Sequence, residues 1–302
     1  MHGLASLDQT RPAQPAGLFE WAPAKINLAL HVVGQRPDGY HLLESIVTFS
    51  TTGDRLSFTA ADADRFTLSG RFSSLLDHTT AADNLVLKAR DMMRRVLAAE
   101  GYATEPVAIH LEKNLPVAAG IGGGSADAAA TLRGLMRLWQ ALLPTEKLSA
   151  IALSLGADVP MCLDGRPLLA RGIGEDITPL PELPRLFLVL GNPLVGVSTP
   201  SVFKHLARKD NPAIPEIGAD IVGALARLRN DLEPPARTLA PEIAAISQMI
   251  AGEGASLTRM SGSGATCFGL FSSAETAERA AARLQAARPD WYFQAMTTTG
   301  AP

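Results

Sequence analysis

A glycine run followed by small residues is the stretch of this sequence best suited to bind an anion. Residues 115–130 read LPVAAGIGGGSADAAA, with four glycines between 120 and 124 ahead of an alanine-rich segment that favours helix. Glycines let the backbone take positive φ and let an anion approach closely, and a helix start offers unpaired N–H groups. Ser125 occupies a position typical of an N-cap, where its hydroxyl could bond a backbone N–H or a phosphate oxygen. The stretch predicts a phosphate-binding loop.

Two common nucleotide-binding motifs do not fit this loop. A Walker A loop requires a lysine directly after its last glycine, and none is present. A dinucleotide fingerprint would place its third glycine at Ser125 or Asp127. For a glycine run alone, a flexible turn between a strand at 107–111 and the helix is the alternative. The order of strand, proline, small residues, glycines and helix favours anion binding.

Other residues could do chemistry but are ambiguous on spacing alone. Apolar residues alternate over 26–32, which predicts a strand with Lys25 and Asn27 on its other face. Such a pair is more typical of a solvated rim. Asp158 follows a helix-ending glycine, where a capping or turn carboxylate is the simpler interpretation. The small residues of 259–266 indicate either a tight hairpin or a second ligand-binding loop.

The remaining pattern predicts elements that hold these residues in an α+β arrangement. A turn is expected at 36–39, and strands between 45 and 68 with breaks at 53–54 and 62–64. The segment 171–183 is rich in Gly, Pro and acids, as expected for a domain crossing. Helices are expected at 84–100, 123–142, 145–155, 217–228, 241–251 and 275–287, and further strands at 185–190, 267–271 and 291–296.

The composition argues against a protein that binds nucleic acid or membranes and against a disulfide-rich protein. The net charge of −3 and pI near 6.1 give no basic field to gather nucleic acid or anionic lipid. Cys162 and Cys267 lie far apart in apolar surroundings, which predicts two buried thiols and no disulfide or metal framework. Residues 1–20 lack the apolar core of a signal peptide, and no apolar run reaches membrane-helix length. We expect a soluble cytoplasmic protein.

Three separated segments together resemble the three motifs of the GHMP small-molecule kinases. They read APAKINLALHVVGQRPDGYHLLES, LPVAAGIGGGSADAAATL and MSGSGATCFGLF. With GADVP, they are most similar to the members that phosphorylate a cytidine diphosphate-linked methylerythritol. The resemblance implies a two-domain α+β fold with the active site in the cleft between the domains. The expected parts are a flexible tail at 1–20, an ATP-binding domain of ribosomal protein S5-like type at 21–172, and a ferredoxin-like substrate domain at 173–302.

The resemblance also implies roles for residues that match the family motifs. Lys25 and Asp158 would be catalytic, and Asp158 would also touch the substrate. Substrate binding would further involve Asn27, Tyr40, His41 and Phe203. ATP would be held by Asn84, Pro116, Val117, Ala118, Ala119, Gly120, Ile121, Gly122, Gly123, Gly124, Ser125 and Ala126.

The implied reaction is phosphoryl transfer from ATP, with Mg²⁺ carried by the nucleotide and no all-protein metal site. The partners would be the two small-molecule substrates, with no nucleic acid or membrane, and the chain would be a monomer or weak homodimer. A related kinase acting on homoserine, mevalonate or a sugar is one alternative. Others are a catalytically silent nucleotide sensor on the same fold and, least favoured by the glycine spacing, a dinucleotide oxidoreductase.

Overall fold

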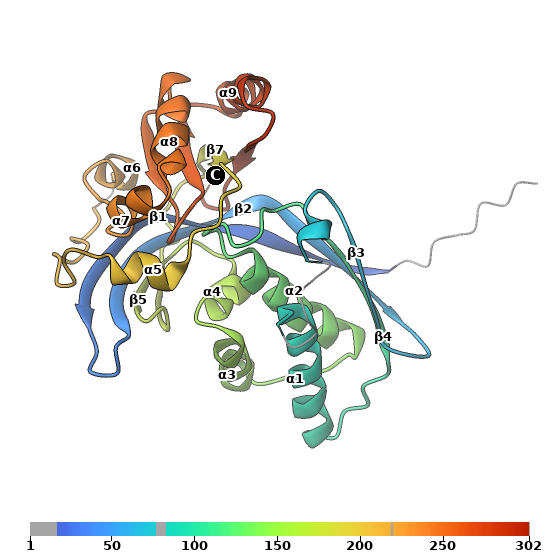
Figure 1. Cartoon of the computed structure of the whole chain (residues 1–302). Coiled ribbons are helices and arrows are strands. Elements are labelled where there is room, and N and C mark those ends of the chain that lie inside the picture. The colour runs from blue at the N-terminus through green and yellow to red at the C-terminus, as the bar shows by residue number, and fades with distance from the viewer. Residues whose placement is uncertain (1–16, 77–82, 219, 302) are drawn as a thin grey trace, which may run out of the picture.

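A long antiparallel pair of strands, β1 (Leu18–Gln35) and β2 (His41–Ala60), crosses the whole molecule (Figure 1). The structure, a computed structural model, describes residues 17–76, 83–218 and 220–301. The predicted tail at 1–20 therefore lies mostly outside the described residues. Its last three residues are strand, because Leu18 to Glu20 pair with β2. The ordered fold thus starts slightly earlier than expected.

The first sheet has six strands in the order β3-β4-β2-β5-β6, with β1 on the other edge of β2. The additional strands are β3 (Arg65–Ser69), β4 (Val107–Glu112), β5 (Leu168–Gly172) and β6 (Asp176–Pro179). The expected break at 53–54 is absent, since β2 runs through it. The expected domain boundary after residue 172 splits a hairpin, because β6 pairs with β5. The first sheet therefore extends to Pro179.

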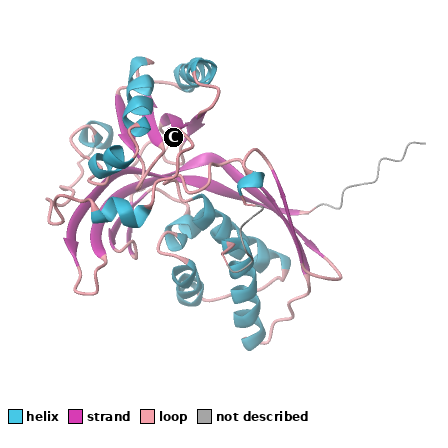
Figure 2. Cartoon of the chain, viewed as in Figure 1, coloured by secondary structure: helices cyan, strands magenta, loops and turns pink. Residues whose placement is uncertain are grey.

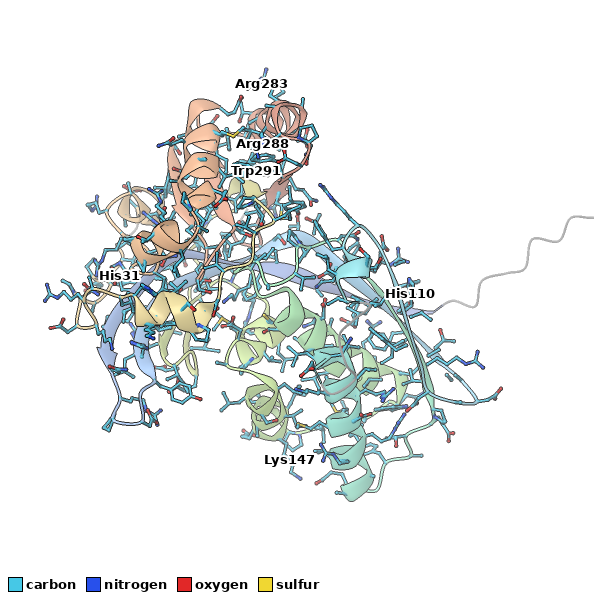
Figure 3. All side chains as sticks on the ribbon, in the orientation of Figure 1. His31, His110, Lys147, Arg283, Arg288 and Trp291 are labelled. Carbon is cyan, nitrogen blue, oxygen red and sulfur yellow. The ribbon has the colours of Figure 1, made fainter. Side chains whose placement is uncertain are left out.

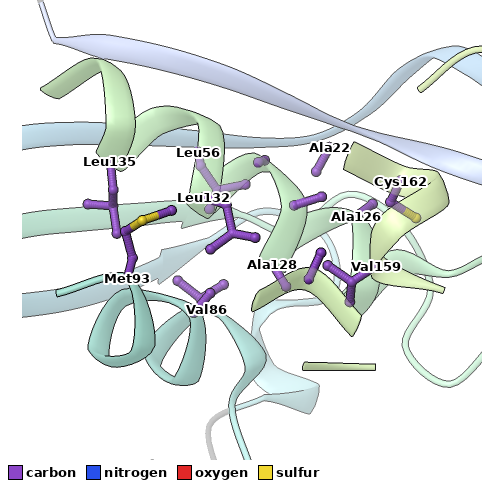
Figure 4. Close-up of a cluster of buried hydrophobic side chains, with 14 of the residues drawn as sticks. Ala22, Leu56, Val86, Met93, Ala126, Ala128, Leu132, Leu135, Val159 and Cys162 are labelled. Atoms are coloured by element: carbon purple, nitrogen blue, oxygen red, sulfur yellow. The ribbon is translucent and has the colours of Figure 1, made fainter. Parts of the chain in front are cut away.

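Four helices cover one face of this sheet: α1 (Leu85–Ala99), α2 (Gly123–Leu138), α3 (Thr145–Leu155) and α4 (Val159–Asp164). Alanines of α2 let it pack closely on β1 and β2, with Leu132 and Leu135 facing Val86 and Met93 of α1 (Figure 4). Helix α2 ends at Leu138, not at 142 as predicted, and Gln140 turns the chain with a φ of 50°.

The second sheet has the antiparallel order β10-β7-β9-β8. Its strands are β7 (Phe187–Asn192), β8 (Leu257–Met260), β9 (Cys267–Phe271) and β10 (Tyr292–Thr297). Helices α8 (Glu242–Gly252) and α9 (Ala274–Ala287) pack on it, giving the βαββαβ order of a ferredoxin-like unit (Figure 2). The expected fold class is confirmed.

The remaining helices are short: η1 (Ser73–Leu75), α5 (Thr199–Lys204), α6 (Ile221–Leu225) and α7 (Glu233–Leu239). Helix α6 is much shorter than the helix predicted at 217–228.

Residues 24–32 of β1 are buried on both faces, because α1 to α4 lie on one side and the second sheet on the other (Figure 1). Ile26 and Leu28 pack toward the second sheet, whereas Ala22 belongs to the core under α2. Consequently Lys25 and Asn27 are only 5% and 4% exposed. The interpretation of this pair as a solvated rim was wrong, since a second covering layer cannot be read from one strand's alternation.

Two composition-based expectations concern cysteines and membrane segments. Cys162 and Cys267 are both free and buried, as predicted, and burial raises the pKa of both thiols. Among helices within the described ranges, none has an apolar stretch long enough to cross a bilayer.

Candidate active site

Two adjoining cavities lie where the glycine loop, α4 and the loop between β8 and β9 meet. The smaller, of about 380 Å³, is lined by the glycine loop and by Lys25 and Asn27. The larger, of about 730 Å³, is lined by Tyr40, His41 and Phe203. The two cavities share six lining residues: Leu43, Ser125, Asp158, Ile173, Thr199 and Phe203. A single continuous site therefore joins a glycine-rich end to an aromatic end.

Lys25 and Asp158 form an ion pair at the junction of the cavities. The Nζ of Lys25 lies 2.7 Å from Oδ2 of Asp158, although 133 positions separate them in the sequence. The Lys25 side chain is 6% exposed and that of Asp158 is 40% exposed. Lys25 comes from β1 and Asp158 from the residue preceding α4. The carboxylate thus faces the cavity while a buried ammonium holds it in place.

The glycine loop starts helix α2 directly beside Lys25. The N-cap is Gly122, with φ of 64°, and not Ser125 as predicted; Ser125 is the third residue of the helix. A Cβ at Gly122 would lie 3.0 Å from the Cβ of Lys25, so the loop approaches β1 as closely as glycine permits. Of the loop residues predicted to bind ATP, those lining the cavity are Ala118, Ala119, Gly120, Gly122, Gly123, Gly124 and Ser125. Pro116, Val117, Ile121 and Ala126 are not among the lining residues.

Ser261 ties the three sequence motifs together. Its hydroxyl accepts from the backbone N–H of Asn27 (3.0 Å) and donates to the carbonyl of Gly120 (3.1 Å). At Gly120, where φ is 74°, a Cβ would lie 2.6 Å from the Ser261 carbonyl oxygen. The loop at 261–266 is therefore both a hairpin connection between β8 and β9 and a wall of the cavity. Ser261 lies in the small-residue loop noted in the sequence, but no role was predicted for it. Ser45, which lines the smaller cavity, was not predicted, since an isolated serine carries no sequence signal.

The aromatic end of the site consists of the side chains predicted to bind a base. His41 and Phe203 stack with ring centroids 4.7 Å apart and an interplanar angle of 24°, and Tyr40 is 62% exposed. Burial, together with the Lys209 ammonium, lowers the pKa of His41 below its ordinary value. Its Nε2 is buried and has no hydrogen-bond partner among the described residues. The ring is therefore neutral at neutral pH and keeps one nitrogen for a ligand.

Asn84 does not line either cavity. Its Oδ1 caps α1 by accepting from the backbone N–H of Val86 at 2.9 Å, as expected from a helix start at this position. The next residue, Leu85, does line the smaller cavity. The sequence placed the helix start correctly, whereas the contact with a nucleotide stays a prediction.

Two labelled histidines in Figure 3 lie away from this site, near opposite ends of the first sheet. His31 is within hydrogen-bond distance of the Pro212 carbonyl (3.0 Å), and the ring of His110 lies between the hydroxyls of Thr67 and Ser69. Among the histidines within the described ranges, His41 is the one that lines the cavities. His41 is therefore the described histidine that could contact a ligand in this site.

A buried charge cluster of Lys113, Asp54 and Asp127 lies beneath the glycine loop. The Nζ of Lys113 donates to Asp54 (2.5 Å) and to Asp127 (2.6 Å). Asp54 also accepts from the backbone N–H groups of Asn114 and Leu115. A Cβ at Gly123 would lie 3.2 Å from this Nζ. The cluster was not predicted, although Lys113 continues the inward alternation of β4 and thereby carried a signal.

The pH dependence of stability should report on Asp127. Burial raises its pKa from 3.8 to about 7, against the attraction of Lys113. Between these values the folded state holds a proton that the unfolded chain has released, so this carboxyl makes the folded state less stable as pH rises. We expect the Asp127→Asn variant to gain roughly 1–4 kcal/mol relative to wild type between pH 4 and pH 7, and no more above it. Urea unfolding at several pH values measures this difference; parallel pH profiles would contradict it.

Comparison with known proteins gives consistent matches. Residues 84–166 match the family model described as GHMP kinases N terminal domain, and residues 211–290 match GHMP kinases C terminal. The 4-diphosphocytidyl-2-C-methyl-D-erythritol kinase of Rhizobium johnstonii is 63% identical over 95% of both chains. That of Rhizobium meliloti is 61% identical over 92% of this chain and 94% of its own.

Solved structures show the same fold. A crystal structure of 4-(cytidine 5'-diphospho)-2C-methyl-D-erythritol kinase superimposes with a TM-score of 0.78 at 36% identity, covering 94% of this chain and 100% of its own. Homoserine kinase from Cytophaga hutchinsonii gives a TM-score of 0.68 at 19% identity, covering 99% and 98%, and shares the fold alone. The resemblance read from the three motifs is confirmed.

Proposed function

Since the chain belongs to the GHMP kinase family, we propose that it transfers the terminal phosphoryl group of ATP to the 2-hydroxyl of 4-diphosphocytidyl-2-C-methyl-D-erythritol. The products are ADP and the 2-phosphate, in the non-mevalonate route to isopentenyl diphosphate. Relatives of that name at 63% and 61% identity support this substrate over homoserine, mevalonate or a sugar. We further propose that the enzyme acts in the cytoplasm as a monomer or weak homodimer.

The observation that carries this proposal is the position of the Lys25–Asp158 pair. It lies where the glycine-lined cavity opens into the aromatic one. A nucleoside triphosphate in the glycine-lined cavity and an alcohol with its base in the aromatic cavity would bring the phosphoryl group and the hydroxyl together beside Asp158. A catalytically silent sensor has no need of such a pair.

The chemistry follows from these positions. The 2-hydroxyl oxygen attacks the γ-phosphorus, and its proton passes to the Asp158 carboxylate. The bond from the γ-phosphorus to the bridging oxygen breaks, and ADP leaves with the electron pair. Lys25 holds Asp158 in place and offsets negative charge on the transferred group. Positioning of the two reactants supplies much of the remaining rate enhancement.

The glycine loop supplies the ATP phosphate site. The backbone N–H groups at the start of α2 and the Ser125 hydroxyl offer donors at the positive end of the helix. We propose that the loop residues 116–126 bind ATP, with Asn84 and Leu85 at the start of α1 near the nucleoside. Asn27 would contact the alcohol through its Oδ1, which is buried without a partner among the described residues.

The residues of the site fit a magnesium ion carried by the nucleotide. Ser125 lines both cavities at the start of α2 and offers a hydroxyl oxygen, the type of ligand that magnesium takes. This residue would complete a coordination shell otherwise made of phosphate oxygens and water. When bound, the ion neutralises phosphate charge. Across the described ranges, no group of three His, Cys, Asp or Glu side chains is placed to hold a metal.

Recognition of the base can be tested at Phe203. Because base–aromatic stacking contributes about 1–3 kcal/mol per base, Phe203→Ala should raise KM for the cytidyl substrate by roughly 10–100-fold. The KM for ATP should stay within about twofold, because the Phe203 ring stacks on His41 at the aromatic end and only borders the glycine-lined cavity. Steady-state kinetics with each substrate varied separately measures this. Trp21→Ala is the matched control, because Trp21 is 55% exposed and lines neither cavity. Equal changes in the two KM values would contradict the assignment.

An ADP-release assay with magnesium ATP tests the function itself. The cytidyl substrate is compared with homoserine and mevalonate. We expect turnover with the cytidyl compound alone. Turnover with another alcohol would support the assignment as a kinase but contradict the base-binding roles proposed for Tyr40, His41 and Phe203. Nucleotide binding with no turnover of any alcohol would favour the sensor.

A further inference from the structure

The hydroxyl group of Ser45 has a single proton, and the structure shows which oxygen accepts the hydrogen bond that this proton makes. Ser45 lies on β2, is 5% exposed and lines the smaller cavity. Its Oγ is 2.7 Å from the carbonyl oxygen of Ala29. Two oxygens at this distance require a proton between them, and the carbonyl has none. Ser45 is therefore a donor to β1 and can only accept from any other partner.

The hydrogen bond from Ser45 to the Ala29 carbonyl determines the orientation of the Asn27 amide. The second contact of the Ser45 hydroxyl is the amide of Asn27, at 2.7 Å. Because Ser45 can only accept there, the Asn27 atom facing it must be Nδ2, which donates. The other amide atom, Oδ1, is buried and has no partner among the described residues. The amide thus keeps its acceptor free at the wall of the cavity.

A β-bulge in β1 lies next to the two side chains. Between Asn27 and Ala29 the register of β1 against β2 shifts by one residue, so that Asn27 pairs with Val47 but Ala29 pairs with Ile46. Such irregularities redirect side chains and are frequent beside active sites. Asn27 is also held from its backbone, which donates to Ser261. The backbone position of Asn27 and the orientation of its amide are therefore both fixed.

We infer that Ser45 is a positioning residue, which holds the Asn27 amide so that its oxygen accepts a hydrogen bond from a substrate hydroxyl. The inference rests on the proposed function. The methylerythritol part is a polyol, and the hydroxyl that is phosphorylated gives its proton to Asp158. Oδ1 then accepts a hydrogen bond from a hydroxyl on a neighbouring carbon. The reversed amide would present N–H groups, and the site would no longer select a hydrogen-bond donor.

The test compares Ser45→Ala and Ser45→Cys with Ser45→Thr. Loss of the hydrogen bond between the Ser45 hydroxyl and the Asn27 amide should lower kcat/KM for the cytidyl substrate by about tenfold in the Ala and Cys variants. Ser45→Thr retains the hydroxyl and should stay within about threefold of wild type. The KM for ATP should not change. Ser247→Ala, which removes another buried hydroxyl that lines neither cavity, is the matched control and should behave as wild type.

A double-mutant cycle separates positioning from a structural effect. Adding Ser45→Ala to Asn27→Ala should cause no further loss, because Ser45 acts through Asn27. The Ser45→Ala penalty should also vanish with the analogue lacking the neighbouring hydroxyl. Wild-type kinetics for Ser45→Ala and Ser45→Cys, or losses that add to that of Asn27→Ala, would overturn this inference and leave the proposed function intact. Absence of wild-type turnover with the cytidyl compound would overturn both.

Discussion

The Asp158→Asn variant should turn over at least about a hundredfold more slowly than wild type. Asparagine keeps the size of the side chain and its place before α4, but its amide cannot accept the proton of the attacking hydroxyl. The Lys25 ammonium keeps a hydrogen-bond acceptor at 2.7 Å and loses its counter-charge. Nucleotide affinity should remain near normal, because the glycine loop is untouched. Single-turnover kinetics and ATP-binding titration measure the two quantities separately.

A matched control lies at the other end of the same helix. Asp164 is the last residue of α4, pairs with Arg166 and lines neither of the two active-site cavities. Asp164→Asn should therefore retain wild-type turnover. If Asp158→Asn kept turnover within a few-fold of wild type while binding ATP normally, the role of Asp158 as proton acceptor would be wrong.

The Lys113→Met variant should lose about 3–5 kcal/mol of unfolding free energy. It removes the cation between Asp54 and Asp127 and leaves two buried carboxyls without their partner. Burial opposes the charge of Lys113, yet Asp127 and Asp54 hold its pKa above the ordinary value. Guanidinium unfolding at neutral pH measures the loss. Since Gly123 lies against Nζ, weaker ATP binding should accompany it.

Two controls define the cause of this loss. Lys147→Met removes an exposed lysine that pairs with Glu100 on the surface near α3 (Figure 3), and should cost at most about 1 kcal/mol. A triple variant that also carries Asp54→Asn and Asp127→Asn should recover much of the stability, because no unpaired charge stays buried. Equal losses in Lys113→Met and Lys147→Met would contradict the assignment of a buried cluster.

The layered fold explains how distant motifs form one site. The long strands β1 and β2 lie between the helices and the second sheet, so residues near the middle of β1 reach both domains. The backbone N–H of Lys25 bonds Ile121 of the glycine loop, and that of Asn27 bonds Ser261 of the second domain. Because Ser261 also bonds Gly120, displacement of the second sheet would shift all three motifs together.

Features that depend on neighbouring residues could be predicted from the sequence alone. Glycine spacing and the alanine run predicted the glycine loop and the helix after it, Asn84 predicted the start of α1, and 36–39 predicted the turn before Tyr40. These are set by backbone conformations and caps that span a few residues. The motif resemblance added the family and the pairing of Lys25 with Asp158.

Burial and contacts between distant parts of the chain could be seen only once the chain was folded. Lys25 was predicted to lie on a solvated rim, but the glycine loop and Asp158, both distant in sequence, cover its side chain. The role inferred for the Ser45 hydroxyl depends on its contact with Asn27 on the neighbouring strand. The cluster at Lys113 joins positions 59 and 14 residues away. Such contacts depend on how sheets and helices pack, because side chains far apart in sequence meet only after the layers close.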